Sequence, residues 1–320
     1  MTGDSKQRQG LALTDHRVLI LGGLLILVTA ALLVGHARLE ATRPDAGAEG
    51  AVHGGAAEPE LLVIEFDSIA AMERAFKDHE FDWPPEAPVP PLQVRTLPEG
   101  LDDTDPDQRK ALFFRSLLPL VLAENARIRR ERGRLIDAFR KDRLQPSSPE
   151  YAFVTQVAER YRLDGDVNDP ELRARLLRRV DVIPVPLALA QAAKESGWGT
   201  SRFTREANNL FGVRTWEQAS GVVPEQRPAG ANHLVRTFPE LRQSVRNYLI
   251  TLNVGGAYSS LRALRAEMRA QAQPLDAIRL AEGLVRYSER GEEYVGELQD
   301  MIRANGLHDL GELRLAEGAN

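Results

Sequence analysis

Glu195 is the residue best placed to do chemistry, because it ends a helix-forming run of otherwise small and aliphatic side chains at residues 184–199. At 3.6 residues per turn these apolar side chains project in every direction, so the helix is expected to be buried nearly all round. Burial and the negative end of the helix dipole both disfavour an ionised carboxylate and raise its pKa. A carboxyl group protonated near neutral pH can act as a general acid. An acid on a solvated helix face is the ordinary alternative, and the apolar surroundings argue against it.

The elements that must position this acid follow from capping residues and apolar periodicity. Pro184 and Pro186 favour the start of the helix, and Gly197 and Gly199 favour its end. A short helix at about 200–205 and three strands at 213–216, 221–223 and 233–238 come next. The sequence therefore predicts a mainly α protein, with a lysozyme-like α+β catalytic domain in which a small antiparallel β-insert faces the acid across a cleft.

Further elements are predicted on both sides of this region. A strand at 61–66 precedes a helix that Ser68 caps and that ends near Lys77, and residues 84–98 form an extended proline-rich connection. The other helices are predicted at 108–143, 151–163, 170–180, 240–253, 259–271, 275–284 and 291–304. Pro119 is expected to kink the first of these rather than end it.

Two charged segments have competing interpretations. Residues 127–143 are strongly basic, and we interpret them as a solvated helix face paired with Glu124 and Glu131, with contact to anionic lipid or polymer as the alternative. The acidic loop at 164–170 lacks the spacing of a calcium-binding loop and is taken as a turn.

The composition excludes several classes of function. The 320 residues are 43% hydrophobic and 27% charged, which is typical of a globular protein, and the net charge of -5 gives no general attraction for nucleic acid. The absence of cysteine excludes disulfides, thiolate metal sites and cysteine nucleophiles. The six histidines form no ligand pair at helical spacing, so no metal and no cofactor is predicted.

The amino-terminal segment indicates export. Residues 18–35 carry no charge and follow Lys6, Arg8 and Arg17, as in a membrane anchor with its amino terminus in the cytoplasm. A cleaved signal peptide is the alternative, but no Ala-x-Ala-like site follows Gly35. We therefore expect a single-pass anchor in the inner (cytoplasmic) membrane, with the catalytic domain in the periplasm or cell-wall space. The predicted parts are a cytoplasmic tail (1–17), the anchor (18–35), a flexible tether (36–60), an N-terminal module with the long helix (61–150), the catalytic domain (151–307) and a tail (308–320).

Several motifs carry a resemblance to a known family. Residues 189–203, which include Glu-Ser-Gly-Trp-Gly, and residues 206–212 resemble the signature of the bacterial peptidoglycan glucosaminidases of glycoside hydrolase family seventy-three. The chain resembles the Bax-type members from about residue 61 to 307. The further matching segments are 66–68, 82–85, 109–115, 221–224, 233–238, 244–248, 252–253, 257–258 and 287–295. Bax-type members often carry a cysteine pair where this chain has Thr215 and Ser220, so its β-insert would lack that staple.

The resemblance implies roles for particular residues. It makes Glu195 the catalytic acid and places Tyr258 beside it, where the phenol could stabilise charge on the sugar. It also implies that Trp198, Asn209 and Phe211 shape the sugar site. For Trp198 and Phe211 the alternative is core packing, because aromatic residues at a helix end or in a turn are more often buried in the core.

In some members of the family that the chain resembles, the β-lobe supplies a second carboxylate. Glu217 and Glu225 are the candidates here, and we choose Glu225. A separation of about 5 Å from the acid would allow direct attack on the sugar, and about 6.5–9.5 Å would allow a base-activated water. The substrate's own N-acetyl group is a third possible nucleophile.

The expected function is that of a membrane-anchored peptidoglycan hydrolase that cleaves β-1,4 glycosidic bonds after N-acetylglucosamine. Its expected partners are peptidoglycan glycan strands and the inner membrane, and we expect a monomer. The alternatives are a muramidase, a lytic transglycosylase or an amidase acting on peptidoglycan, and a non-catalytic wall-binding module.

Overall fold

The computed structural model describes residues 60–217, 221–223 and 234–316. Within these residues no helix is both long enough and apolar enough to cross a membrane. The predicted anchor and all but the last residue of the predicted tether lie outside the described residues, so both stay predictions. The same holds for the candidate carboxylate Glu225.

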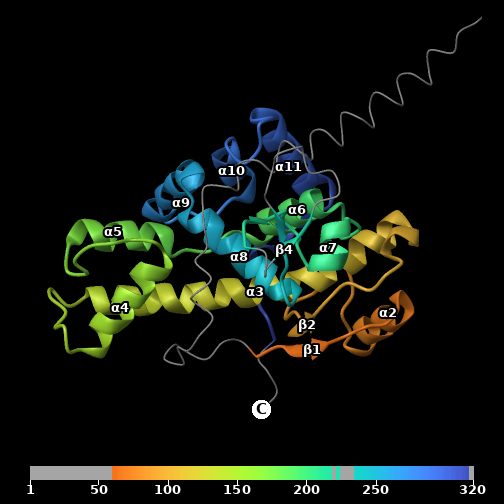
Figure 1. Ribbon diagram of the computed structural model, residues 1–320, viewed down its shortest axis with the longest axis horizontal. Coiled ribbons are helices and arrows are strands. Elements are labelled where there is room, and N and C mark those ends of the chain that lie inside the picture. Colours follow the sequence, from red (N-terminus) through yellow and green to blue (C-terminus); the bar gives the residue numbers. More distant parts are fainter. Residues whose placement is uncertain (1–59, 218–220, 224–233, 317–320) are drawn as a thin grey trace, which may run out of the picture.

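The helix that carries the acid lies at the centre of the fold. This helix, α6 (Val185–Ser196), contacts α3 (Pro106–Phe139), α10 (Ala277–Ala281), α11 (Glu292–Ala304) and the 3₁₀ helix η6 (Leu307–Glu312). In Figure 1, α3 crosses the molecule horizontally, and α6, α10 and α11 lie above it. All residues of α6 except Lys194 and Glu195 are buried, which confirms the predicted all-round burial.

The two ends of α6 form as their residues predict. Pro184 is the N-cap and Pro186 lies in the first turn. Gly197 ends the helix in a left-handed conformation with φ of 58°, which glycine adopts without a steric penalty. Gly199 permits a close approach to the N-terminal part of the chain, because a Cβ there would lie 2.5 Å from Cδ1 of Leu97.

The long helix α3 joins the predicted N-terminal module to the catalytic domain. Asp105 caps its start, and Pro119 lies inside it without ending it, as predicted. The helix contacts β2 (Leu92–Val94), α6 and α8 (Leu241–Val254). The buried apolar residues form one continuous core from Leu61 to Leu313. Residues 61–150 and 151–307 therefore share a core.

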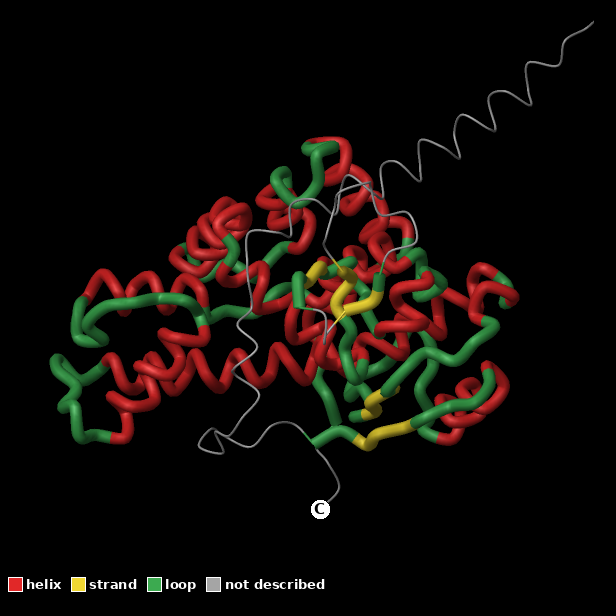
Figure 2. Tube along the Cα trace, in the orientation of Figure 1, coloured by secondary structure: helices red, strands yellow, loops and turns green. Residues whose placement is uncertain are grey.

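The strands form two small sheets. β1 (Leu62–Ile64) pairs in parallel with β2 (Leu92–Val94), a strand that the sequence indicated only as extended chain. The second sheet is antiparallel and has the order β3-β5-β4, with β5 (Leu234–Arg236) between β3 (Arg214–Thr215) and β4 (Gly221–Val222). It confirms the predicted β-insert, and Figure 2 shows how short its strands are compared with the helices.

The remaining helices mostly agree with the predicted positions. The predicted helix at 275–284 divides into α10 and η5 (Glu282–Leu284). The helices not yet named are α2 (Ile69–Asp78), α4 (Pro149–Arg160), α5 (Pro170–Arg179), α7 (Arg202–Ala207) and α9 (Ser259–Ala270), with the 3₁₀ helices η2 (Leu101–Asp103) and η4 (Gly256–Tyr258).

Residues 308–316 lie against the body of the protein. η6 contacts α6 and α11. After η6, the carbonyl of Arg314 accepts from the amide of Val89 at 2.8 Å, and the amide of Ala316 donates to the carbonyl of Val89 at 2.8 Å. The described part of the segment predicted as a tail thus packs against the chain that precedes β2.

Two buried carboxylates hold helices together through arginines. Glu124 on α3 accepts hydrogen bonds from Arg127 on the same helix and from Arg242 and Arg246 on α8, at 2.8–3.0 Å. The predicted pairing of the basic segment with Glu124 is therefore confirmed. The predicted solvated face is wrong at Glu124, whose side chain is 0% exposed because α8 packs over it.

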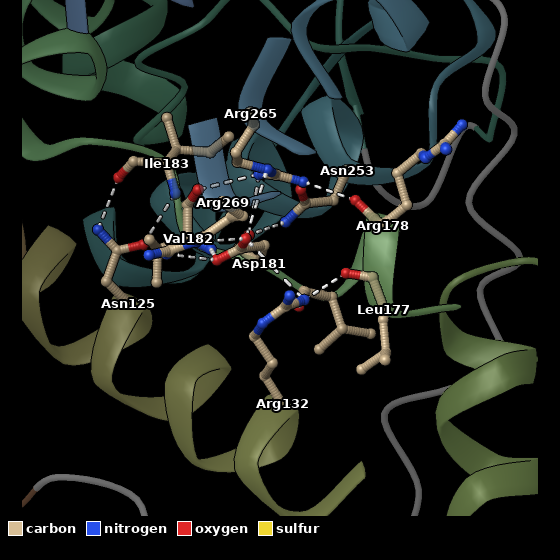
Figure 3. Close-up of polar contacts among 11 residues, drawn as sticks. Asn125, Arg132, Leu177, Arg178, Asp181, Val182, Ile183, Asn253, Arg265 and Arg269 are labelled. Atoms are coloured by element: carbon tan, nitrogen blue, oxygen red, sulfur yellow. Dashed lines mark hydrogen bonds and ion pairs between the residues drawn. The ribbon is translucent and has the colours of Figure 1, made fainter. Parts of the chain in front are cut away.

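Asp181, which follows α5, is the second such carboxylate. Arg269 donates two hydrogen bonds to it at 2.9 and 3.0 Å, and Arg132 and Arg265 lie 3.9 Å from it. Arg265 also donates to the backbone carbonyls of Asp181 and Val182, as Figure 3 shows. This cluster connects α3, α9 and the segment that leads into α6.

Candidate active site

The carboxyl group of Glu195 lies in the last turn of α6 and has a tyrosine as its hydrogen-bond donor. The hydroxyl of Tyr294, on α11, donates to Oε1 of Glu195 at 2.8 Å. Glu195 itself keeps part of its surface exposed. Tyr294 itself is 3% exposed, so the donor of this hydrogen bond is buried.

The pKa of Glu195 is raised from 4.5 to about 7. Burial is the main cause, because it disfavours the charged form. The hydrogen bond from Tyr294 and the charge of Lys194 act in the opposite direction and do not outweigh it. The predicted rise is confirmed, and near neutral pH a large fraction of Glu195 is protonated.

Further tyrosines surround the acid. The ring of Tyr287 stacks on that of Tyr294 with 5.2 Å between centroids, and the ring of Tyr258 lies 5.9 Å from that of Tyr287. Tyr258 is 2% exposed, and burial followed by the negative charge of Glu195 raises the pKa of its phenol. Tyr258 is therefore a neutral hydroxyl near the acid, and its role at the sugar stays a prediction.

Trp198 lies beside the acid in sequence but packs against α3. Its ring makes edge contacts with Phe113 and Phe114, with centroids 6.1 and 5.2 Å away, and the ammonium of Lys110 lies 5.8 Å from its centroid. Its indole remains partly exposed. The packing alternative therefore describes much of this side chain, and contact with a sugar stays a prediction.

Asn209 holds the turn after α7 to the small sheet. Its Nδ2 donates to the carbonyls of Val213 and Arg236 at 2.8 Å each, and its Oδ1 accepts from the amide of Val213 at 2.9 Å. The side chain is 1% exposed. Asn209 therefore fixes where β5 lies relative to α7, and direct contact with a substrate stays a prediction.

Phe211 is also buried, and it stacks on Tyr248 of α8 with 4.0 Å between ring centroids. Tyr248 in turn contacts α6 through Gln191. Phe211 thus supports the packing behind the acid, and its predicted role in the sugar site is untested.

Of the two candidate second carboxylates, only Glu217 lies within the described residues. It follows β3, is exposed, and its amide donates to Oγ1 of Thr215 at 3.2 Å. The preferred candidate, Glu225, lies outside them. In the part of the chain that the structure describes, no group of three or more His, Cys, Asp or Glu side chains could hold a metal ion.

Comparison with known proteins places this site in a family. Residues 171–307 match the family described as "Mannosyl-glycoprotein endo-beta-N-acetylglucosaminidase". The protein called "Protein bax" from Escherichia coli (strain K12) is 34% identical over 198 residues, which cover 62% of this chain and 70% of that protein. The chain belongs to the Bax-type family of glucosaminidase-domain proteins. No solved structure matches it.

The glucosaminidase match contains the acid and the tyrosines around it. Glu195, Tyr258, Tyr287 and Tyr294 all lie between residues 171 and 307. The match supports a glycosidase-type enzyme. The helix α3 lies before the matched region and packs against α6. Part of the support for the helix that carries Glu195 therefore comes from outside the glucosaminidase match.

Several residues of the site have no role in the sequence prediction, among them Gln191, Tyr287 and Tyr294. Gln191 lies four residues before Glu195, which puts the two side chains on the same face of α6. That spacing is a signal that sequence alone could have used. Tyr294 is 99 residues away from Glu195 and no local pattern connects them.

Proposed function

We propose that this chain is a peptidoglycan hydrolase that cleaves the β-1,4 glycosidic bond after N-acetylglucosamine, with Glu195 as the general acid. The observation that carries the proposal is a carboxyl with a pKa of about 7 whose hydrogen-bond donor is a neutral phenol. The family match supports the glycosidic bond as the target.

Glu195 has the properties that the acid step requires. Its protonated carboxyl transfers a proton to the glycosidic oxygen as the bond to the sugar carbon breaks, and the leaving sugar departs as a neutral alcohol. The carboxylate that results keeps the hydrogen bond from Tyr294. The neutral hydroxyl of Tyr258 is proposed to stabilise the charge that develops on the sugar.

The group that attacks the sugar is proposed to be Glu225, acting directly or through a water molecule. Glu217 and the N-acetyl group of the substrate are the alternatives. The stereochemistry of the product separates direct or N-acetyl attack, which retains configuration, from a base-activated water, which inverts it.

The proposed setting is the outer side of the inner membrane. Residues 18–35 would anchor the chain, and residues 36–60 would let the catalytic part reach glycan strands in the periplasm or cell-wall space as a monomer. The uncharged run and the basic residues before it support this proposal.

Digestion of purified sacculi tests the reaction. The purified chain is incubated with sacculi, and the soluble products are identified by mass spectrometry. We expect new reducing ends at N-acetylglucosamine. Reducing or anhydro muramic ends would indicate a muramidase or a lytic transglycosylase, freed peptides an amidase, and intact strands a wall-binding module.

The variant Glu195→Gln tests the acid. It keeps the shape of the side chain but removes its proton, so the rate should fall by about 10²- to 10⁴-fold. Glu171→Gln, a change in an exposed acid on α5, is the matched control and should keep the wild-type rate. Wild-type turnover by Glu195→Gln would overturn the assignment.

A further inference from the structure

A chain of hydrogen bonds leads to Glu195 from the interior of the protein. The hydroxyl of Tyr248 on α8 donates to Oε1 of Gln191 at 2.6 Å, and Nε2 of Gln191 donates to the hydroxyl of Tyr294 at 3.0 Å. Tyr294 then donates to Oε1 of Glu195. Tyr248, Gln191 and Tyr294 are at most 3% exposed. Three helices, α8, α6 and α11, therefore meet in this chain.

The orientation of the Gln191 amide fixes the direction of the bonds in the chain. Its oxygen accepts from Tyr248, so its nitrogen faces Tyr294 and donates to the phenol oxygen. The hydroxyl of Tyr294 has a single hydrogen, which is left for Oε1 of Glu195 whether the carboxyl is ionised or neutral. To reverse these bonds the amide would have to flip, and the buried hydroxyl hydrogen of Tyr248 would lose its acceptor, which is costly.

We propose that Tyr294, held by Gln191 and Tyr248, is a positioning residue that assigns the proton of Glu195 to Oε2. Since Oε1 already accepts the hydrogen of Tyr294, the neutral carboxyl carries its own hydrogen on the other oxygen. Oε2 is then the atom that faces the glycosidic oxygen and gives up the proton. This inference rests on the proposed function, because it concerns the acid of that reaction.

The charged groups around Glu195 leave Tyr294 as its direct donor. Lys194 is the neighbour on α6, but its ammonium forms an ion pair with Glu297 on α11 and lies 5.5 Å from the centroid of the Tyr294 ring. Arg290 also pairs with Glu297. The phenols of Tyr248, Tyr258 and Tyr287 are close enough for the charge of Glu195 to raise their pKa values, and burial keeps them neutral.

The variant Tyr294→Phe separates positioning from packing, because it removes one hydroxyl and keeps the ring. The purified full chain is assayed on soluble glycan-strand fragments, and kcat/KM is measured against pH, since this profile reports the free enzyme. Wild type should lose activity as pH rises through about 7, where Glu195 loses its proton. In Tyr294→Phe that limb should move up by about one pH unit, because the lost hydrogen bond stabilised the ionised form.

The rate should fall as well. Without its donor the carboxyl can place its proton on either oxygen, and the carboxylate that forms in the reaction loses a stabilising hydrogen bond. We therefore expect kcat to drop by about tenfold with KM little changed. Tyr248→Phe removes only the hydrogen bond farthest from Glu195. It should therefore move the limb in the same direction by less.

Tyr161→Phe is the matched control. Tyr161 is also buried, and its hydroxyl also donates to a glutamate, Glu131 on α3, at 3.0 Å. The same atom is therefore lost from the same kind of bond in another part of the protein. Its pH limb should stay at the wild-type position.

Two results would overturn the inference. One is an unmoved limb in a folded Tyr294→Phe, and the other is an equal shift in Tyr161→Phe. If Tyr294→Phe does not fold, Gln191→Met takes its place, and an unmoved limb in that variant counts against the inference equally. An active Glu195→Gln would instead refute the proposed function, so the two failures are distinguishable.

Discussion

Glu195 and Glu124 are both glutamates placed on buried helices, yet their pKa values move in opposite directions. Burial is the largest influence on each and raises both pKa values. At Glu124 the hydrogen bond and charge of Arg246, with the charges of Arg127 and Arg242, outweigh burial and lower the pKa to about 2. At Glu195 the direct donor is a phenol, and the pKa rises to about 7.

The difference teaches that the charge of the donors, and not burial, separates a carboxyl group with a lowered pKa from one with a raised pKa in this chain. Asp181 belongs with Glu124: burial raises its pKa, but the hydrogen bond from Arg269 and the charges of Arg265, Arg132 and Arg269 lower it overall. A guanidinium stabilises the ionised carboxylate as an ion pair does, whereas a phenol contributes only a neutral hydrogen bond.

The largest expected effect comes from breaking the arginine-bound site. Glu124→Ala would leave Arg127, Arg242 and Arg246 without their shared carboxylate between α3 and α8. Removal of one partner of a buried ion pair typically costs about 3–5 kcal/mol of unfolding free energy. Denaturant unfolding of the purified chain measures this loss.

An exposed ion pair provides the control for that measurement. Asp300→Ala removes the partner of Arg303 on the surface of α11, and it should change the unfolding free energy by less than about 1 kcal/mol. Equal losses in Glu124→Ala and Asp300→Ala would contradict the structural importance of the buried carboxylate.

The next effect is on the pH dependence of stability. Glu195 has a folded pKa of about 7 and an ordinary value of 4.5, so between these values the folded state binds the proton more tightly than the unfolded state. Its contribution is therefore fully present below about pH 4.5 and is lost as pH rises through about 7. Wild type should lose about 2–3 kcal/mol relative to Glu195→Gln between pH 4 and pH 8.

Unfolding curves of both proteins at pH 4, 6 and 8 measure this difference. Glu124 contributes with the opposite sign at lower pH, because its lowered pKa makes its contribution present above about pH 4.5 and lost as pH falls toward about 2. Both proteins contain Glu124, so this contribution cancels in their comparison. A constant difference in unfolding free energy between wild type and Glu195→Gln at all three pH values would show that the pKa of Glu195 is not raised.

The smallest effect concerns Lys194, a cation near Glu195. The charge of Lys194 lowers the pKa of Glu195, so Lys194→Met should raise it further. Since Lys194 is already paired with Glu297, we expect the alkaline limb of kcat/KM to rise by less than about half a pH unit. A downward shift, or one larger than that of Tyr294→Phe, would contradict this ranking of the two groups.

The features of the fold that could be predicted from the sequence are those that depend on residues close together along the chain. The apolar run around Glu195 defines α6, its two ends and the burial of its acid, because helix periodicity and capping act within a few residues. The helices and the short strands of the insert follow for the same reason. The pairing of β1 with β2 was not predicted, because the proline-rich segment around β2 has no strand pattern of its own.

Contacts between distant residues decide the rest of the site. Tyr294 approaches Glu195 from 99 residues away, and Arg246 approaches Glu124 from 122 residues away. The packing of the helices brings each pair into contact, and no local spacing in the sequence predicts either contact. The predicted roles of Trp198, Asn209, Phe211 and Glu225 stay predictions for a related reason, since each depends on where a sugar lies.

The position of α6 against α11 and η6 has a consequence for the order in which the protein is made. A nascent chain that has reached only residue 290 contains α6 but lacks α11 and η6, two of the elements that pack on it. Part of the cover over α6 is therefore made last. The ribosome completes most of the chain before the surroundings that set the proton affinity of Glu195 are all present.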